Sequence, residues 1–167
     1  MIFSSLTFLY VFLPLLMVCY FIVPGRGKNI ILLIFSLVFY AYGQFEYVWL
    51  LMFFCVFNFV SGMAIGGIKH LQMRRAMLAA GLCMDFGWLI YFKCADFAAL
   101  PLGISFFAFQ TAAYLIDVFR EDVKPCRNIL DFSVYVTFFG KLSAGPIVRY
   151  GQIREALAAR RDRKSVV

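Results

Sequence analysis

Charged side chains are scarce in this chain. Of its 167 residues, 15% are charged, whereas 63% are hydrophobic and 19% are aromatic. A soluble domain carries roughly 25% charged and about 45–50% apolar residues. A water-soluble fold of this size would have too little polar surface to cover so many apolar side chains. The composition therefore excludes an ordinary soluble domain and indicates a protein dissolved in a lipid bilayer.

The residues that usually carry enzyme chemistry are also few. The five cysteines are an odd number without metal or disulfide spacing, and Cys19, Cys55 and Cys83 lie in apolar runs, where cysteine behaves as a small hydrophobic residue. The sole histidine, His70, stands beside Lys69 in a basic stretch and is expected at the membrane surface. The sequence has no nucleophile elbow, carboxylate pair or phosphate-binding glycine loop. The residues thus indicate no metal site, no bound cofactor and no catalytic group.

Long hydrophobic runs, in contrast, fill most of the chain. Five of them, the second a short one, are predicted to be helices that cross a hydrocarbon core of about 30 Å. They are residues 6–23, 30–42, 47–68, 76–92 and 100–119. The first has no basic region before it and no cleavage site, so it is predicted to be a retained helix and not a signal peptide. Gly62 and Gly66 in the third have the GxxxG spacing that lets another helix approach closely. The fifth is expected to begin at Pro101, a residue tolerated in a first helical turn.

Lysine and arginine are distributed unevenly among the loops between these runs. Cytoplasmic loops carry an excess of both residues. With the N-terminus outside, eight of them lie inside and only Lys93 lies outside. The eight are Arg26, Lys28, Lys69, Arg74, Arg75, Arg120, Lys124 and Arg127. The predicted topology is therefore five crossings with an external N-terminus.

The sixth apolar segment, residues 129–150, is less regular. Its first half is apolar, whereas glycine, serine, Lys141 and Pro146 crowd its second half. A sixth crossing would place Lys141 in the membrane and a basic tail outside, against the charge rule. We therefore predict a re-entrant segment, which is allowed where protein or a water-filled cavity surrounds it.

The predicted fold class is all-α, a polytopic transmembrane helical bundle of about five crossings plus this re-entrant segment. The membrane domain is expected over residues 1–152, and residues 153–167 are expected to form a basic cytoplasmic tail. The tail lacks the interleaved aromatic residues of a nucleic-acid surface, so anionic lipid headgroups are its expected partner and nucleic acid is not.

Four polar residues within the predicted helices could carry chemistry. An ionised Asp85 at the centre of the fourth run would cost about 2.5–3.5 kcal/mol on insertion scales, so it is either functional or a protonated or hydrogen-bonded residue that holds helices together. On the fifth run Gln110, Tyr114 and Asp117 recur at helical spacing and share one face. This stripe either lines a cavity or is structural, with Asp117 paired to Arg120 one turn on.

Three stretches of the chain resemble the membrane-bound O-acyltransferase family. They are PLGISFFAFQTAAYLIDVFR (101–120), NILDFSVYVTFF (128–139) and SAGPIVRY (143–150). Within the family the chain is most similar to the bacterial branch that contains the alginate O-acetyltransferase membrane subunit and the D-alanyl transfer protein of teichoic acids. The opening MIFSSLTFLYVFLPL and the segment NIILLIFSLVFYAYGQFEYVWLLMFF fit the same branch. The resemblance covers nearly residues 1–155 in the family's order.

The resemblance implies acyl transfer, commonly of acetyl, from a cytoplasmic thioester donor such as acetyl-CoA to a hydroxyl of an extracytoplasmic polysaccharide such as alginate. The implied setting is a bacterial inner membrane, with membrane lipids, the polysaccharide and periplasmic acetylation proteins as partners. Related enzymes enclose a central cavity. Arg149, in AGPIVRY, would lie in its wall with Asp85 and the stripe of Gln110, Tyr114 and Asp117.

The chain also departs from that family. The family's catalytic histidine lies in the C-terminal half of members several hundred residues long, and His70 does not match it. Asp85 stands where asparagine is common. We therefore expect the N-terminal portion of such an enzyme, truncated and inactive alone. Two alternatives stay open: a non-catalytic membrane scaffold or remnant, and a small transporter that uses Asp85 and the Gln110 stripe as a polar path.

Overall fold

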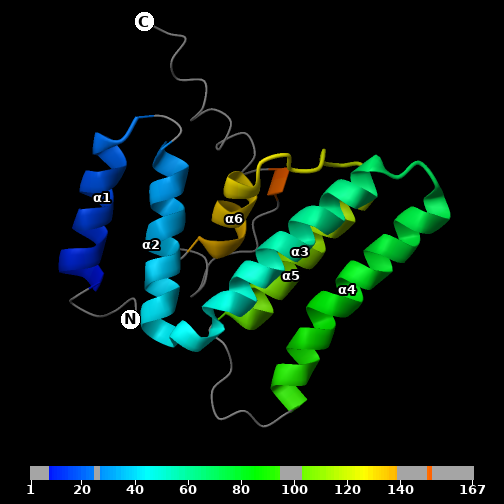
Figure 1. Cartoon of the computed structure of the whole chain (residues 1–167), viewed down its shortest axis with the longest axis horizontal. Coiled ribbons are helices and arrows are strands. Elements are labelled where there is room, and N and C mark those ends of the chain that lie inside the picture. Colours follow the sequence, from blue (N-terminus) through cyan, green and yellow to red (C-terminus); the bar gives the residue numbers. More distant parts are fainter. Residues whose placement is uncertain (1–7, 25–26, 95–102, 139–149, 152–167) are drawn as a thin grey trace, which may run out of the picture.

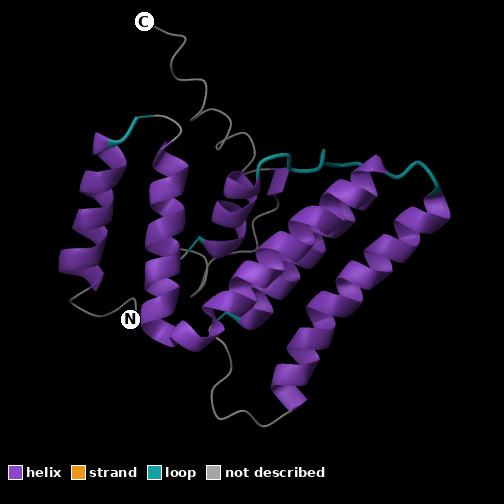
Figure 2. Ribbon diagram, viewed as in Figure 1, coloured by secondary structure: helices purple, strands orange, loops and turns teal. Residues whose placement is uncertain are grey.

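The computed structural model describes residues 8–24, 27–94, 103–138 and 150–151. The secondary-structure elements among these residues are helices joined by loops, without a strand (Figure 2), which confirms the predicted all-α class. In chain order the elements are a π-helical turn η1 (Phe8–Phe12), α1 (Leu13–Ile22), α2 (Gly27–Gln44), a 3-10 turn η2 (Phe45–Tyr47), α3 (Val48–Gly67), α4 (Leu71–Cys94), α5 (Ile104–Phe119) and α6 (Ile129–Thr137).

Successive helices run in alternating directions (Figure 1). One end of the molecule holds the connection from α1 to α2, the connection from α3 to α4, and the end of α5. The opposite end holds the turn between α2 and α3 and the end of α4. Side-chain contacts agree with this arrangement. At the first end, Asn29 of α2 donates a hydrogen bond to Asp131 of α6 (2.7 Å). At the other, the rings of Tyr47 and Phe92 meet with centroids 5.7 Å apart.

Basic side chains gather at the first of these two ends. Lys28 lies in the first turn of α2, Lys69 links α3 to α4, and Arg120 directly follows α5. Lys93 instead lies in the last turn of α4, at the opposite end, where Trp49 lies in the first turn of α3. We call these the basic end and the aromatic end of the molecule.

α4 and α5 are among the helices that begin at residues other than those predicted. α4 begins at Leu71 and not at residue 76, so Arg74 and Arg75 lie in the helix and not in the loop. Arginine is a good helix former, so the helix continues past its apolar part. α5 begins at Ile104 and not at Pro101, because Gly103 adopts a φ of 73°, a left-handed conformation that glycine accepts without strain.

Two stretches are long and apolar enough to cross a membrane. They are Gly27–Gly67 and Leu71–Cys94. The first contains both α2 and α3, which η2 joins at an angle (Figure 1). The apolar helices Tyr10–Ile22 and Ile104–Phe119 are shorter. Helix length thus identifies two spanning stretches, and five crossings stays a prediction.

Large apolar side chains lie both inside and outside the bundle. The rings of Phe54 and Phe107 are fully buried and meet edge to face (5.0 Å). In contrast Phe21, Ile22 and Phe45 are more than 70% exposed. Soluble monomers rarely expose contiguous apolar patches larger than a few hundred Å². A surface with so many exposed apolar side chains is typical of a protein surrounded by lipid.

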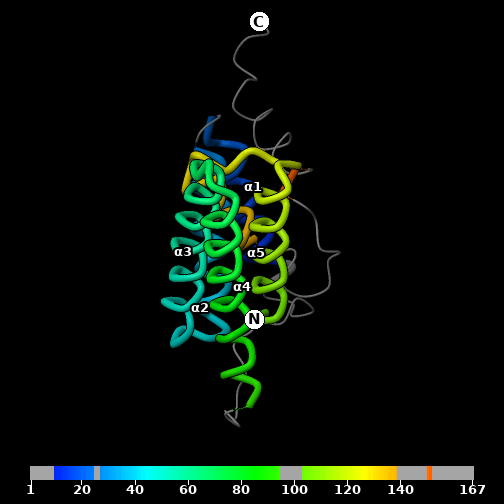
Figure 3. Tube along the Cα trace, turned by 90° about the vertical axis from the view of Figure 1, so that its right-hand side faces the viewer, coloured from blue at the N-terminus to red at the C-terminus, as the bar shows by residue number. Residues whose placement is uncertain are grey.

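The GxxxG pair of α3 permits the close approach that its spacing predicts. A β-carbon at Gly62 would lie 2.5 Å from the ring of Tyr114 on α5, and one at Gly66 would lie 2.5 Å from Pro125 in the loop after α5. Viewed from the side, α4 lies in front of α3 and α5 and between them (Figure 3). Small residues on α3 therefore let the central helices pack tightly.

The short helix α6 begins the segment predicted to be re-entrant. It has nine residues, and the side chain of Asn128 caps its start by accepting a hydrogen bond from the backbone N–H of Leu130 (3.1 Å). A helix of this length is too short to cross a bilayer, which needs about 20 residues. Residues 139–149, the second half of the predicted re-entrant segment, lie outside the described residues.

Candidate functional site

A buried carboxylate joins the three central helices. Asp85 of α4 is fully buried, and its Oδ1 accepts a hydrogen bond from Nδ2 of Asn58 on α3 (2.8 Å). Its Oδ2 accepts one from Oγ1 of Thr111 on α5 (2.9 Å). We call these three residues the Asp85 cluster. Its geometry favours the structural alternative for Asp85, a hydrogen-bonded residue that holds helices together.

The Asp85 cluster has fewer hydrogens than its short contacts need if Asp85 is ionised. Thr111 has one hydroxyl hydrogen, yet its Oγ1 lies within 3.1 Å of three acceptors: Oδ2 of Asp85 and the carbonyls of Phe107 and Ala108. A proton on Oδ2 of Asp85 would donate to Oγ1 and free the hydroxyl for a carbonyl. The cluster can therefore accommodate a neutral Asp85 carboxyl group. In that state the single hydroxyl hydrogen of Thr111 is no longer shared between the carboxylate and the carbonyls.

The predicted stripe on α5 is buried, and two of its residues contact α6 or the loop before it. Gln110 and Tyr114 are fully buried, and Asp117 is 8% exposed. Nε2 of Gln110 donates to the carbonyl of Tyr135 on α6 (2.7 Å), and the hydroxyl of Tyr114 accepts from the backbone N–H of Cys126 (3.0 Å). The prediction that these three residues share an inward face is confirmed. Whether that face lines a cavity stays a prediction.

A cluster of aromatic residues extends the stripe. The ring of Tyr150 contacts those of Tyr114 and Tyr135, with centroids 5.2 Å apart in both pairs. We call Gln110, Tyr114, Tyr135 and Tyr150 the α5–α6 cluster. Arg149, the remaining predicted cavity residue, lies outside the described residues.

The two clusters lie on different sides of α5. Gln110 and Thr111 are consecutive, and consecutive helical residues point about 100° apart because a turn takes 3.6 residues. Thr111 points to Asp85 on α4, whereas Gln110 points to α6. The structure thus does not bring Asp85 together with the stripe, although the sequence suggested one shared polar path.

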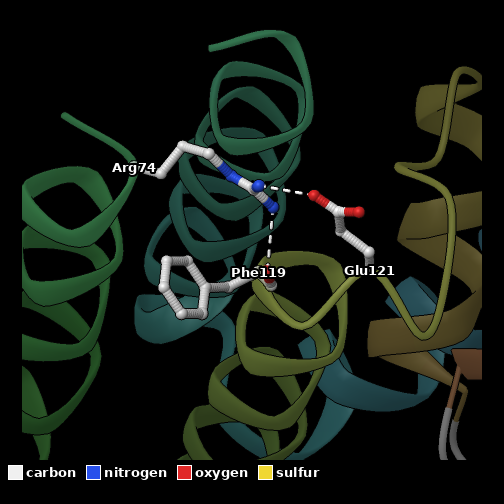
Figure 4. Close-up of polar contacts among 3 residues, drawn as sticks. All are labelled: Arg74, Phe119 and Glu121. Carbon is white, nitrogen blue, oxygen red and sulfur yellow. Dashed lines mark hydrogen bonds and ion pairs between the residues drawn. The ribbon is translucent and has the colours of Figure 1, made fainter. Parts of the chain in front are cut away.

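At the basic end, Arg74 links the start of α4 to the end of α5 through an ion pair and a hydrogen bond (Figure 4). Its Nη1 lies 2.6 Å from Oε1 of Glu121, and its Nη2 donates to the carbonyl of Phe119 (2.8 Å). The guanidinium also lies over the Phe119 ring, 5.4 Å from its centroid. Only 14% of the Arg74 side chain is exposed. This residue is therefore more firmly held than an ordinary surface cation.

The predicted pairing of Asp117 with Arg120 is wrong. Nε of Arg120 instead lies 3.3 Å from Oδ2 of Asp122. The helix ends at Phe119, and Glu121 has a left-handed φ of 63°, so the chain turns back. The backbone carbonyl of Asp117 then accepts from the N–H of Asp122 (3.0 Å). The turn brings Asp122 to the arginine and leaves Asp117 in the buried face.

Sequence reasoning missed Asn58 and Thr111. Asn58 is the one amide within the apolar run 47–68, which is a usable signal, although nothing in the spacing pairs it with Asp85. Thr111 gives a weaker signal, since threonine also bonds to its own helix. His70 is exposed between α3 and α4, as expected. Among the described residues, no group of three or more His, Cys, Asp or Glu side chains could hold a metal ion.

Comparison with curated proteins finds relatives along almost the whole chain. A probable alginate O-acetylase of Azotobacter vinelandii is 36% identical over 173 residues, covering 90% of this chain and 34% of the relative. One from Pseudomonas aeruginosa is 35% identical, covering 90% of this chain and 33% of the relative. A peptidoglycan O-acetyltransferase of Helicobacter pylori is 28% identical, covering 92% and 38%. The chain thus spans about a third of the length of these relatives. No family model and no solved structure matches it.

Proposed function

We propose, on the premise that this chain belongs with the alginate O-acetylases, that it takes part in O-acetyl transfer to an extracytoplasmic polysaccharide. The premise rests on identities of 33–36% over about 90% of the chain, which confirm the resemblance found in the sequence. The same relationship, with the exposed apolar helices, makes the chain a membrane protein. This homology is the observation that carries the proposal, because the clusters alone specify no reaction.

The proposed topology is five crossings, α1 to α5, in a bacterial inner membrane with the N-terminus outside. The alternating helix directions support it, because they gather Lys28, Arg74 and Arg120 at one end and leave Lys93 at the other. That basic end would face the cytoplasm. Residues 129–150 would enter from the cytoplasm and return, and residues 153–167 would form a cytoplasmic tail.

Reporter fusions test this topology. Fusions after Phe45 should read as external, because Phe45 lies in the turn between α2 and α3. Fusions after Gln72 and Asp122 should read as internal, because both positions lie at the basic end. A cytoplasmic reading at Phe45 would contradict the proposed orientation.

In the proposed reaction, a hydroxyl of the polysaccharide attacks the thioester carbonyl of a donor such as acetyl-CoA. An ester forms, the carbon–sulfur bond breaks, and the thiol leaves with the hydroxyl proton. We assign no catalytic group within this chain. Gln110, Tyr114, Asp117 and Arg149 would line the cavity between the two substrates. In support, Oε1 of the buried Gln110 has no hydrogen-bond partner in the described part of the chain. This oxygen is therefore free to accept a hydrogen bond from a substrate.

Asp85 would play a different part, although the sequence also suggested it for the cavity wall. Both of its carboxylate oxygens bind residues of neighbouring helices. Its proposed role is therefore to hold α4 beside the cavity and not to contact substrate.

A chimera tests the proposal. This chain would replace the matching residues of the Azotobacter vinelandii alginate O-acetylase, in an alginate-producing strain that lacks its own enzyme. O-acetyl esters on the secreted alginate should return, and Gln110→Leu should reduce them more than Gln72→Leu, an exposed control. A chimera inserted at the normal level that forms no ester would contradict the proposal.

A second experiment assays the purified chain by itself for release of thiol from acetyl-CoA. The chain is expected to release none, because a positioned base typically contributes about 10²–10⁴-fold and its sole histidine, His70, is exposed outside both clusters. Turnover that His70→Ala abolishes would instead make that histidine the base.

A further inference from the structure

Helix α4 has two opposite faces. The residues that bury one face against the bundle are Gly81, Asp85, Leu89 and Phe92. On the other face, the exposed residues between Arg75 and Ile90 are all small: Ala76, Ala79, Ala80, Cys83 and Gly87. Because successive helical residues turn by about 100°, these five fall in one sector directly opposite the buried stripe. We call them the small face of α4.

The exposed faces of neighbouring helices look different. Val18 and Phe21 of α1 are more than half exposed, as are Trp49 and Val60 of α3. From Arg74 to Leu89, in contrast, every large apolar side chain of α4 is buried or half-buried. Large apolar side chains are the ones that hydrocarbon favours. The small face therefore lacks the side chains that a lipid-facing surface carries elsewhere in this molecule.

An apolar groove adjoins the small face at the aromatic end. Here α3 and α4 separate (Figure 1), and the space between them has a volume of about 590 Å³. Cys83 and Gly87 belong both to the small face and to the lining of this groove, which Trp49 and Trp88 also line. The two tryptophans meet edge to face, with ring centroids 6.4 Å apart. The small face and the groove thus form one continuous surface.

The shape of this surface suits another helix. Small residues on a membrane helix let a second backbone approach closely. The site is open, because a β-carbon at Gly87 would meet nothing within 4 Å. A helix lying along the small face would hold its flanking side chains over the groove, which has room for large apolar ones. The surface therefore matches a helix that carries bulky apolar side chains on one flank.

We propose that a transmembrane helix packs on the small face of α4, and that it comes from the part of the acetylase that this chain does not match. The chain covers 34% of the Azotobacter vinelandii relative, which leaves about two thirds of that protein to pack beside the corresponding region. Of the two stretches long enough to cross a membrane, the one formed by α4 is both the less apolar and the less buried. Lipid would favour the opposite combination, and a covering helix removes the mismatch.

The proposal rests on the family of the chain and not on acetyl transfer. Its test measures contacts between segments and no acetyl ester. Failure of one proposal therefore leaves the other standing.

Site-specific cross-linking tests it in the full-length chimera described above, with a protease site at the junction. p-Benzoylphenylalanine, which bonds to a neighbouring C–H group on illumination, would replace Ile90, one turn beyond Gly87 on the same side of α4. Val18 of α1, which is similarly exposed, would be the control position. After illumination and cleavage, the two parts should stay joined from Ile90 and separate from Val18. Equal joining from both positions would overturn the proposal, as would attachment of Ile90 to lipid alone.

Two glycine variants supply a matched pair. Gly87→Leu adds bulk to the small face and should lower joining from Ile90 about tenfold, because overpacking a close contact is unfavourable. Gly67→Leu, at a helical glycine of α3 equally free of neighbours, should behave like the parent. Joining that Gly87→Leu leaves unchanged would overturn the proposal. Cross-links between two copies of the chimera would overturn it in favour of a second copy. If Gly87→Leu lowers the folded yield, the comparison of Ile90 with Val18 decides.

Discussion

Helices α4 and α5 are neighbours, yet they are held in the molecule in different ways. α5 buries ten of its 16 residues, apolar and polar together, between α3, α4 and α6. α4 is longer, at 24 residues, but buries only Gly81, Asp85, Leu89 and Phe92, which follow one another at helical spacing along a narrow stripe. α5 is thus a core helix that packing alone can hold. α4 is held by a few specific contacts. Those of Asp85 with α3 and α5, and of Arg74 with the end of α5, are polar.

The largest effect is expected from removing the carboxylate that attaches α4. Asp85→Leu leaves one N–H of the Asn58 amide without its acceptor, because the other donates to the Phe54 carbonyl. An unsatisfied buried group costs about 1–3 kcal/mol, whereas the Thr111 hydroxyl keeps the carbonyls of Phe107 and Ala108 as acceptors. Thermal unfolding in detergent should show this loss. Hydrogen exchange should increase in α4 and much less in α5.

Asp85→Asn is the matched control for that variant. An amide retains hydrogen-bonding capacity and removes the cost of a buried charge, so this variant should be neutral or mildly stabilising. If it lowers the folded yield as much as Asp85→Leu does, the carboxylate itself is required and Asp85 belongs among the functional residues.

The next loss, in the same range, is expected at the contact between Gly62 and Tyr114, which fixes α5 against α3. Gly62→Ala places a methyl group 2.5 Å from the Tyr114 ring, and overpacking of this kind typically costs about 1–3 kcal/mol. Gly67→Ala, in the same helix, meets no atom within 4 Å. Equal melting temperatures for the two variants would show that Tyr114 moves freely, against the tight packing described for α5.

The smallest effect is expected at the basic end. Arg74→Gln removes an ion pair whose acidic partner, Glu121, is 74% exposed, and exposed pairs contribute about 0–1 kcal/mol. The additional bond to the Phe119 carbonyl places Arg74 near the top of that range. Arg120→Gln, whose pair with Asp122 is exposed on both sides, should change the unfolding temperature less than Arg74→Gln does. The reverse order would mean that Arg74 does not attach α4.

Local patterns in the sequence predicted the helices and the inward face of α5, because both follow from periodicity within one segment. A carboxylate in an apolar run also identified Asp85 without any structure. Its partners were not predictable, because Asn58 and Thr111 lie 27 and 26 residues away and their hydrogen bonds depend on how the helices pack. The predicted pair of Arg120 with Asp117 was wrong for a related reason. The partner of Arg120 depends on the left-handed turn at Glu121, which the sequence pattern did not indicate.

The position of the Asp85 partners along the chain has a consequence for synthesis. Asn58 precedes Asp85 and Thr111 follows it, so when α4 enters the bilayer only the amide has already been made. An uncompensated aspartate at a helix centre costs about 2.5–3.5 kcal/mol on insertion scales, and Asn58 is the first group that can offset this cost. We therefore expect Asn58→Leu to reduce the fraction of chains in which α4 inserts during translation, whereas Thr111→Val acts only after α5 has been made.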